Sequence, residues 1–253
     1  LSREESGEVW RKTKALVLHK IGDVARLQTD SLIISSFIAV AMSGIVDNYN
    51  LVINAVTNFV NIIFNSVISS FGNLIATETK ERQYELFQVY RFFASWVYGF
   101  AVTGFFVLLT PLVRIWLGDA WVLPASAVAL ILIDLYFKGD RIVLSNYKTA
   151  AGVFEQDKYL ALIQGGVNLV LSIWLVQKIG LAGIYVGTVI SGLIANLTKP
   201  VIIYRVCFGR SSRSYFAESL RYAGTVAVLA AGLKLVGNRV MAQPAIGSFL
   251  LMV

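Results

Sequence analysis

Stretches of about twenty apolar residues follow one another from residue 22 to the end of the chain, separated by short polar connections. A helix of about twenty apolar residues is long enough to cross a hydrocarbon core of roughly 30 Å. Lipid offers no partners for backbone N–H and C=O groups, so a chain with several such stretches folds as a bundle of transmembrane helices. We therefore expect an all-α, polytopic membrane protein.

Glycine-rich or charged connections divide the chain into seven predicted spans and the beginning of an eighth. The spans are residues 22–46, 50–76, 88–112, 121–146, 158–177, 181–204 and 217–237, with a partial span from residue 245. Turn signals lie at Gly44–Asn48, Gly118–Asp119, Gly152–Lys158 and Lys178–Gly180. Because the chain opens with a charged, loop-like segment and stops within an apolar one, we expect it to be part of a longer protein.

The composition agrees with a membrane bundle, since 57% of residues are hydrophobic and only 15% are charged. An average soluble domain has about 25% charged residues, so a soluble catalytic domain is excluded. Lys and Arg number 11 in connections on the N-terminal side and 4 on the opposite side. This asymmetry predicts that the N-terminal segment is cytoplasmic. The net charge of +7 therefore reflects topology, and we expect no nucleic-acid partner.

Two residue types that often carry chemistry occur only once each. Cys207 has no second cysteine with which to form a disulfide, and we interpret it as an apolar filler near the membrane edge. His19 has no cysteine or histidine at ligand spacing. We therefore predict neither a metal site nor a cofactor.

The placement of polar side chains within the spans is the most informative feature. A charge at span depth costs roughly 2.5–3.5 kcal/mol on insertion scales and usually faces a bundle interior or an aqueous cavity. The first span opens with four charges of alternating sign, at spacings of 3, 3 and 4 residues: Lys20, Asp23, Arg26 and Asp30. This spacing places them on one helical face, which cannot face lipid.

The second span carries an amide stripe at spacings of 4, 3, 4 and 4 residues: Asn54, Asn58, Asn61, Asn65 and Ser69. Such a stripe serves either as hydrogen-bonded glue between helices or as the wall of a polar path. Four amides exceed the need of one close-packed interface, so we favour the path.

Other spans repeat the pattern with fewer residues. The fourth span has Asp134, Lys138 and Arg141, for which an internal Asp134–Lys138 pair is an equal alternative to a role in the path. The fifth has Gln164, Asn168 and Ser172, and the sixth has Asn196 and Lys199. Arg91 begins the third span, where we expect its side chain to extend to the membrane interface. The sixth span also bears a predicted close-packing face, Gly183, Gly187, Ser191 and Ala195.

Several short segments, in order along residues 10–220, resemble the Wzx-type polysaccharide flippases of bacteria. They are Thr29–Ser35, Asn48–Asn50, Ser70–Glu78, Ile115–Gly118, Ala150–Phe154 and Gly180–Thr188. Each segment is weak alone, and their combination carries the resemblance. The superfamily of these proteins also contains the multidrug MATE exporters and the lipid II flippases.

The resemblance implies a two-lobed bundle of twelve or fourteen helices around a central cavity, of which this chain would hold the second lobe. Residues 1–15 would be the cytoplasmic linker between lobes, 16–209 the six-helix C-terminal lobe, and 210–253 an additional helix and the start of a final one. The implied partners are the N-terminal lobe of the same protein, the lipid bilayer and polysaccharide polymerases. The implied location is the bacterial inner membrane.

The resemblance also implies a function: moving polyprenyl-pyrophosphate-linked oligosaccharides to the outer leaflet by alternating access, for surface polysaccharides such as O-antigen or capsule. No enzymatic activity or catalytic residue is expected. A slight cationic surplus at span depth suits a pyrophosphate, for which the candidates are Lys20, Arg26, Lys138 and Arg141. Candidates for the glycan are Asn54, Asn58, Asn61, Asn65, Gln164 and Asn168. Asp30 or Asp134 could bind a coupling proton or cation.

Two other functions compete with this one. A MATE-type, cation-coupled multidrug antiporter would favour an acidic, aromatic cavity, whereas the charges here sum to a slight cationic surplus. A membrane-embedded glycan polymerase or ligase would need a sizeable outer loop with catalytic residues. The longest outer connection, around Pro111–Trp121, offers only Arg114 and Asp119.

Overall fold

The computed structural model describes residues 29–241 and, ahead of them, residues 10, 13, 14 and 17, with side chains described up to residue 237. Lys20, Asp23 and Arg26 of the predicted first stripe lie outside the described residues. So do His19 and the partial span predicted from residue 245. The described residues form helices joined by turns and contain no strand, which confirms the all-α prediction.

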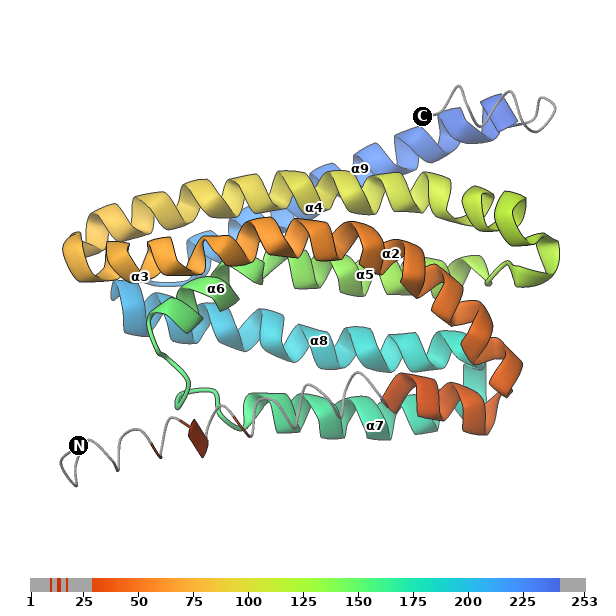
Figure 1. The fold of residues 1–253 in the computed structure, drawn as a ribbon, viewed down its shortest axis with the longest axis horizontal. Helices are drawn as coiled ribbons and strands as arrows, with labels where there is room; N and C mark the ends of the chain where they lie inside the picture. Colours follow the sequence, from red (N-terminus) through yellow and green to blue (C-terminus); the bar gives the residue numbers. More distant parts are fainter. Residues whose placement is uncertain (1–9, 11–12, 15–16, 18–28, 242–253) are drawn as a thin grey trace.

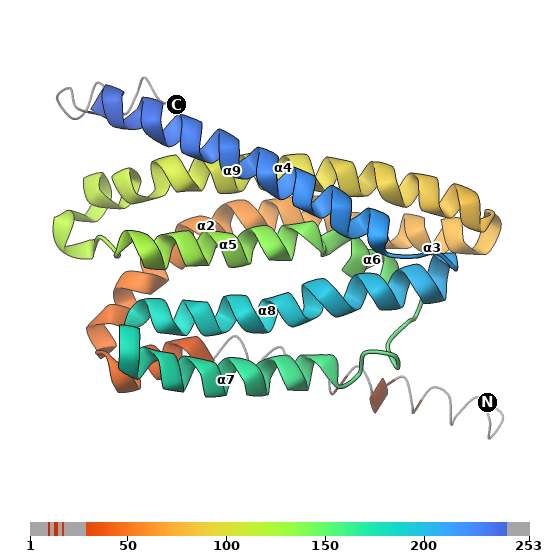
Figure 2. The ribbon, with the colours of Figure 1, turned by 180° about the vertical axis from the view of Figure 1, so that it is seen from behind.

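Residues 29–37 are helical, and a bend leads into α2 (Val40–Ser66) and α3 (Ile68–Thr77). The chain continues through α4 (Lys80–Leu117), the 3₁₀ turn η1 (Asp119–Trp121), α5 (Ala125–Asp140) and α6 (Ile142–Ala150). A hairpin of α7 (Leu160–Ile179) and α8 (Leu181–Ile203) follows, then the π-helical turn η2 (Tyr204–Phe208) and α9 (Arg213–Met241). The long helices run side by side, with α8 between α5 and the outermost helix α7 (Figure 1). Helix α9 crosses α4 obliquely, and its C-terminal end projects beyond the bundle (Figure 2).

Five helical segments of the described chain are long and apolar enough to cross a membrane: Val40–Thr77, Lys80–Leu117, Leu160–Ile179, Leu181–Phe208 and Arg213–Gly237. This is compatible with a multi-pass membrane protein. The predicted fourth span, 121–146, is divided into α5 of 16 residues and α6 of 9 residues. The total of seven spans and the likeness to a MATE lobe therefore stay predictions.

One predicted boundary is wrong. Helix α2 runs without interruption through the predicted turn Gly44–Asn48, and within it the Asn48 amide Nδ2 donates to the Gly44 carbonyl oxygen at 2.9 Å. The bend lies earlier, at Ala39, whose backbone is extended at φ −171° and ψ 149°. The turns predicted around Gly118, Gly152 and Gly180 are confirmed, and each of these glycines has a positive φ.

The predicted small-residue face of α8 is confirmed as the surface that packs against α7. A Cβ atom added to Gly183 would lie 2.4 Å from the backbone carbonyl of Leu175, and one added to Gly187 would lie 2.5 Å from the Ser172 hydroxyl. Two helices approach this closely only where side chains are absent. The α7–α8 hairpin is consequently one of the most tightly packed parts of the bundle.

Helix α4 connects the two sides of the bundle. Its 38 residues span about 57 Å, and it packs against α2, α5 and α9. Near its N-terminal end an aromatic cluster joins α3, α4, α6 and η2. The ring of Tyr147 lies 5.2 Å from that of Phe71, 5.7 Å from that of Phe87 and 4.9 Å from that of Phe208.

Candidate functional site

The amide stripe of α2 lies on the surface of the described bundle. Asn54, Asn58 and Asn65 are exposed, and their amides make no hydrogen bond within the described part of the chain. Asn61 is half-buried, and its Oδ1 accepts a hydrogen bond of 2.6 Å from the Tyr98 hydroxyl of α4. The stripe therefore contributes one helix–helix bond and leaves three amides available for other partners.

Ser69, the last residue of the predicted stripe, is exposed on α3, and the polar surface continues beyond it through the exposed Asn73 and Thr77. The same spacing of four residues links these positions, so the sequence contained a signal for Asn73 and Thr77 that the prediction did not use. The buried face of α2 is a different one and includes Ile53, Thr57, Val60 and Phe64. A third face exposes large apolar side chains such as Phe59 and Ile62, at 67% and 70%.

Asp134 and Lys138 form the internal pair considered as an alternative at sequence level. The Lys138 Nζ lies 2.7 Å from the Asp134 Oδ2; the Asp134 side chain is 8% exposed and that of Lys138 is 47% exposed. A half-exposed lysine can neutralise a buried carboxylate and still contact a further anion.

Arg141 points elsewhere, into the contact between α5 and α8. It stands between α5 and α6, is buried, and donates from Nη1 to the Asn196 Oδ1. The same nitrogen lies 3.5 Å from the Gly192 carbonyl oxygen. The Asn196 amide in turn donates to the Phe137 carbonyl of α5 at 3.3 Å. The structure thus brings Arg141 to α8 rather than to the exposed side of Lys138.

The polar residues predicted in the fifth span are buried between α7 and α8. The Gln164 amide donates to the Ser191 carbonyl at 2.9 Å, and the Ser172 hydroxyl donates to the Ile184 carbonyl at 3.1 Å. Asn168 is fully buried, and its amide donates to the Thr188 hydroxyl oxygen at 3.0 Å. These side chains join two helices, so we remove Gln164 and Asn168 from the candidate glycan-binding residues.

Thr188 brings Asp30 and Asn168 together, although the three residues belong to three different predicted spans. Its hydroxyl donates to the Asp30 Oδ2 at 2.9 Å and accepts from the Asn168 amide. The Asn168 carbonyl oxygen Oδ1 is buried and accepts no hydrogen bond from the described residues. The Thr188 hydroxyl thus lies between the Asp30 carboxylate and the Asn168 NH2 group. Sequence reasoning selected Asp30 and missed Thr188.

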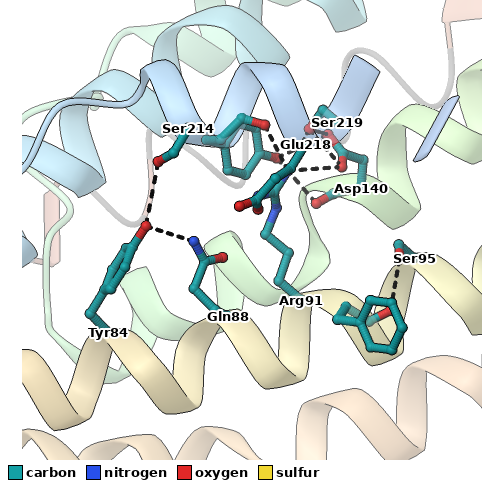
Figure 3. Close-up of polar contacts among 10 residues, drawn as sticks. Tyr84, Gln88, Arg91, Ser95, Asp140, Ser214, Glu218 and Ser219 are labelled. Carbon is teal, nitrogen blue, oxygen red and sulfur yellow. Dashed lines mark hydrogen bonds and ion pairs between the residues drawn. The ribbon is translucent and has the colours of Figure 1, made fainter. Parts of the chain in front are cut away.

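Arg91 is the side chain for which the sequence-based interpretation is wrong. Instead of extending to the membrane interface, it is 2% exposed and lies at the centre of a polar cluster between α4, α5 and α9 (Figure 3). Its Nη1 lies 2.5 Å from the Glu218 Oε2, and its Nη2 lies 3.9 Å from the Asp140 Oδ1. Nη2 also donates to the Ser219 hydroxyl and the Tyr215 carbonyl, at 2.7 and 2.8 Å.

Aromatic and hydroxyl groups complete this cluster. The Arg91 guanidinium carbon lies 3.8 Å from the centre of the Tyr215 ring, and the Tyr215 hydroxyl donates to the Asp140 Oδ2 at 3.0 Å. We call Arg91, Asp140, Tyr215, Glu218 and Ser219 the Arg91 cluster. The sequence contained a weak indication of this cluster. Asp140 and Glu218 lie at the ends of two other predicted spans, on the same predicted side of the membrane as Arg91.

A second buried ion pair fixes the connection between α6 and α7. The Lys148 Nζ lies 2.6 and 2.5 Å from the two carboxylate oxygens of Asp157, and both residues are buried. This pair shapes the loop that follows Gly152.

Comparisons with known proteins add no identification. No protein-family model, curated protein or solved structure matches this chain significantly. Among the described residues, no group of three or more His, Cys, Asp or Glu side chains is arranged to hold a metal ion.

Proposed function

We propose that this chain forms one wall of a transmembrane path and that the protein is a flippase for polyprenyl-pyrophosphate-linked oligosaccharides. The observation that supports this most is the row of exposed amides along α2, which have no hydrogen-bond partner within the described chain. Polar side chains on a membrane-spanning helix are costly against lipid and occur where they face an interior or a cavity. A second lobe of the same protein would complete the path.

Amides suit a glycan cargo of varied composition. Each asparagine offers a carbonyl acceptor and two N–H donors, so it can match a sugar hydroxyl in either role. Asn54, Asn58 and Asn65 place these groups along one helical face, spread over three turns. A sliding oligosaccharide could exchange hydrogen bonds from one amide to the next.

The charged end of the cargo would contact Lys138. Its side chain is half exposed and its ammonium group is paired with Asp134, whereas Arg141 is directed into α8. We therefore assign the pyrophosphate contact to Lys138 and give Arg141 a positioning role. Lys20 and Arg26, which lie outside the described residues, stay proposed contributors.

Coupling to a proton or cation would use Asp30. The carboxylate lies beside the Thr188 hydroxyl, which in turn accepts from Asn168, and the Asn168 carbonyl oxygen is buried without a donor. We infer that the Asp30 carboxylate, with the Thr188 hydroxyl oxygen beside it, binds the coupling proton or a small hard cation. Asp134 is the weaker candidate because Lys138 already neutralises it.

The test uses the full-length protein in bacterial cells whose own flippase gene is deleted, with surface polysaccharide as the readout. Replacing Asn54, Asn58 and Asn65 together by Leu should abolish export while the protein stays in the membrane at normal level. The matched control replaces Phe59 and Ile62, on the exposed apolar face of the same helix, by Leu. Normal export by the triple variant would exclude the path along α2.

A drug-efflux assay on the same cells separates the proposal from a multidrug antiporter. Cells that gain drug resistance without restored polysaccharide would show that the path serves small cationic molecules instead. Restored polysaccharide without resistance supports the flippase.

A further inference from the structure

An apolar cavity of about 370 Å³ lies between α4, α5 and α9. Figure 2 shows the arrangement of these three helices. Its walls include Val102 and Phe106 of α4, Leu132 and Tyr136 of α5, and Ala223 and Ala230 of α9. The cavity opens to the surface of the bundle, since Ile133 and Ala227 at its edge are exposed. The polar stripe of α2 contributes no residue to it.

One residue in the wall of this cavity, Tyr136, carries a buried hydrogen-bond donor without an acceptor in the described part of the chain. Tyr136 is 8% exposed, and its hydroxyl has no hydrogen-bond partner among the described residues. One helical turn further along α5 is Asp140 of the Arg91 cluster, which lies beyond the residues that line the cavity. Native structures pair almost all buried donors with protein, water or a ligand, so the Tyr136 hydroxyl can donate to an acceptor of a molecule bound in the cavity.

The surroundings restrict the chemistry of that molecule. Arg91 already faces the carboxylates of Asp140 and Glu218, so the cluster has no surplus positive charge for a phosphate. The cavity walls are almost wholly apolar, which excludes a sugar. An engineered cavity of about 150 Å³ holds benzene, so by proportion this one holds about fifteen carbon atoms. One fatty acyl chain fits this volume, and a long polyprenyl chain exceeds it.

We propose that this cavity binds one fatty acyl chain of a membrane phospholipid, whose ester carbonyl accepts a hydrogen bond from the Tyr136 hydroxyl. The chain would fill the wedge between α9 and the α4–α5 pair and hold α9 at its oblique angle. The site requires only that these helices lie in a membrane. This proposal is therefore independent of the proposed oligosaccharide transport, and each can fail without the other.

A second apolar cavity provides an internal reference. It lies between α2 and α4, has a volume of about 390 Å³, and is lined by residues such as Val52, Val97 and Phe100. Its lining residues carry no polar side chain. A lipid that merely surrounds the protein should occupy both cavities equally, whereas the proposed site should hold its lipid in preference.

The experiment reconstitutes the full-length protein in bilayers of phosphatidylethanolamine and phosphatidylglycerol. A trace of phosphatidylethanolamine with a diazirine near the ester end of one acyl chain is photoactivated, and labelled peptides are mapped by mass spectrometry. Labelling should concentrate around Tyr136 and Ala223, well above that around Phe100. Tyr136→Phe, which keeps the cavity shape, should lower this labelling about fivefold through loss of one hydrogen bond.

Variants on α9 test whether the labelling depends on the open volume of the cavity. Ala227→Trp fills the cavity and should reduce the labelling to the level around Phe100, with Ala230→Leu as a milder substitute should the larger side chain prevent folding. Val228→Trp is the matched control, because Val228 is 72% exposed and does not line the cavity. Equal labelling in both cavities, or labelling unaffected by Ala227→Trp and Ala230→Leu, would overturn the proposal. If an equimolar polyprenyl phosphate displaces the labelled phospholipid, the occupant of the cavity is the carrier lipid and the phospholipid proposal is wrong.

Discussion

Arg91 of α4 and Glu218 of α9 form an ion pair in which Nη1 and Oε2 lie 2.5 Å apart. Asp140 of α5 joins them from the third side, and the guanidinium is almost fully buried. This relationship attaches the N-terminal part of α9 to the bundle, and α9 then crosses α4 obliquely, with only its C-terminal end projecting beyond the bundle (Figure 2). The Arg91 cluster is therefore the main polar anchor of α9.

Removing the arginine should destabilise the protein strongly. Arg91→Ala leaves Asp140 buried without its cation, and breaking a buried pair from one side costs about 3–5 kcal/mol. The measurement is the free energy of unfolding in detergent. The control is Arg82→Ala, which breaks the exposed Arg82–Glu85 pair and should cost about 0–1 kcal/mol. Similar losses for the two variants would contradict the anchoring role of Arg91.

The close contact between α7 and α8 predicts that one added methyl group on α8 lowers the stability of the protein. Gly183→Ala places a Cβ atom 2.4 Å from the Leu175 backbone, and the separation it forces should cost about 1–3 kcal/mol. Gly166→Ala on α7 is the control, because no atom lies within 4 Å of its added Cβ. Thermal unfolding in detergent compares the two. A Gly183→Ala variant as stable as Gly166→Ala would show that the two helices can separate without cost.

The hydrogen bonds of Thr188 predict that its replacement uncouples export from the transmembrane ion gradient. Thr188→Val keeps the shape of the side chain but removes its bonds with Asp30 and Asn168. Export should lose its dependence on the transmembrane proton or cation gradient, with the protein still present in the membrane. Thr198→Val is the matched control, since the Thr198 hydroxyl donates only to the Ile194 carbonyl of its own helix. Gradient dependence that survives Thr188→Val would exclude this cluster as the coupling site.

Much of the helical framework could be predicted from the sequence because it depends on local pattern. Apolar runs of membrane-spanning length, glycines with positive φ at Gly118 and Gly180, and the small residues of α8 each act within one helix or turn. The predicted turn at Gly44–Asn48 failed because a side chain that often ends a helix can also bond to the carbonyl one turn earlier, as Asn48 does.

The orientation of the polar stripes could not be predicted from their spacing. The amides of α2 and α7 recur at the same helical period, yet Asn58 is exposed and Asn168 is fully buried against α8. Spacing shows that side chains share a face, and the packing of neighbouring helices decides what that face contacts. The same reason applies to Arg91, whose partners Asp140 and Glu218 are distant in sequence and belong to two other helices.

Lys138 has two possible roles, to neutralise Asp134 and to contact the pyrophosphate of the cargo, and substitutions in the Asp134–Lys138 pair separate them. Lys138→Met should lower both stability and export, because the buried Asp134 carboxylate loses its lysine and the path loses a cation. Changing both residues, Asp134→Asn with Lys138→Met, should restore the protein level but not export. The loss of one charged hydrogen bond to the cargo corresponds to roughly a tenfold to hundredfold lower rate. Lys138→Arg keeps the charge and should export, and Asp134→Asn alone controls for loss of the carboxylate. Normal export by the double variant would show that Lys138 serves only to neutralise Asp134.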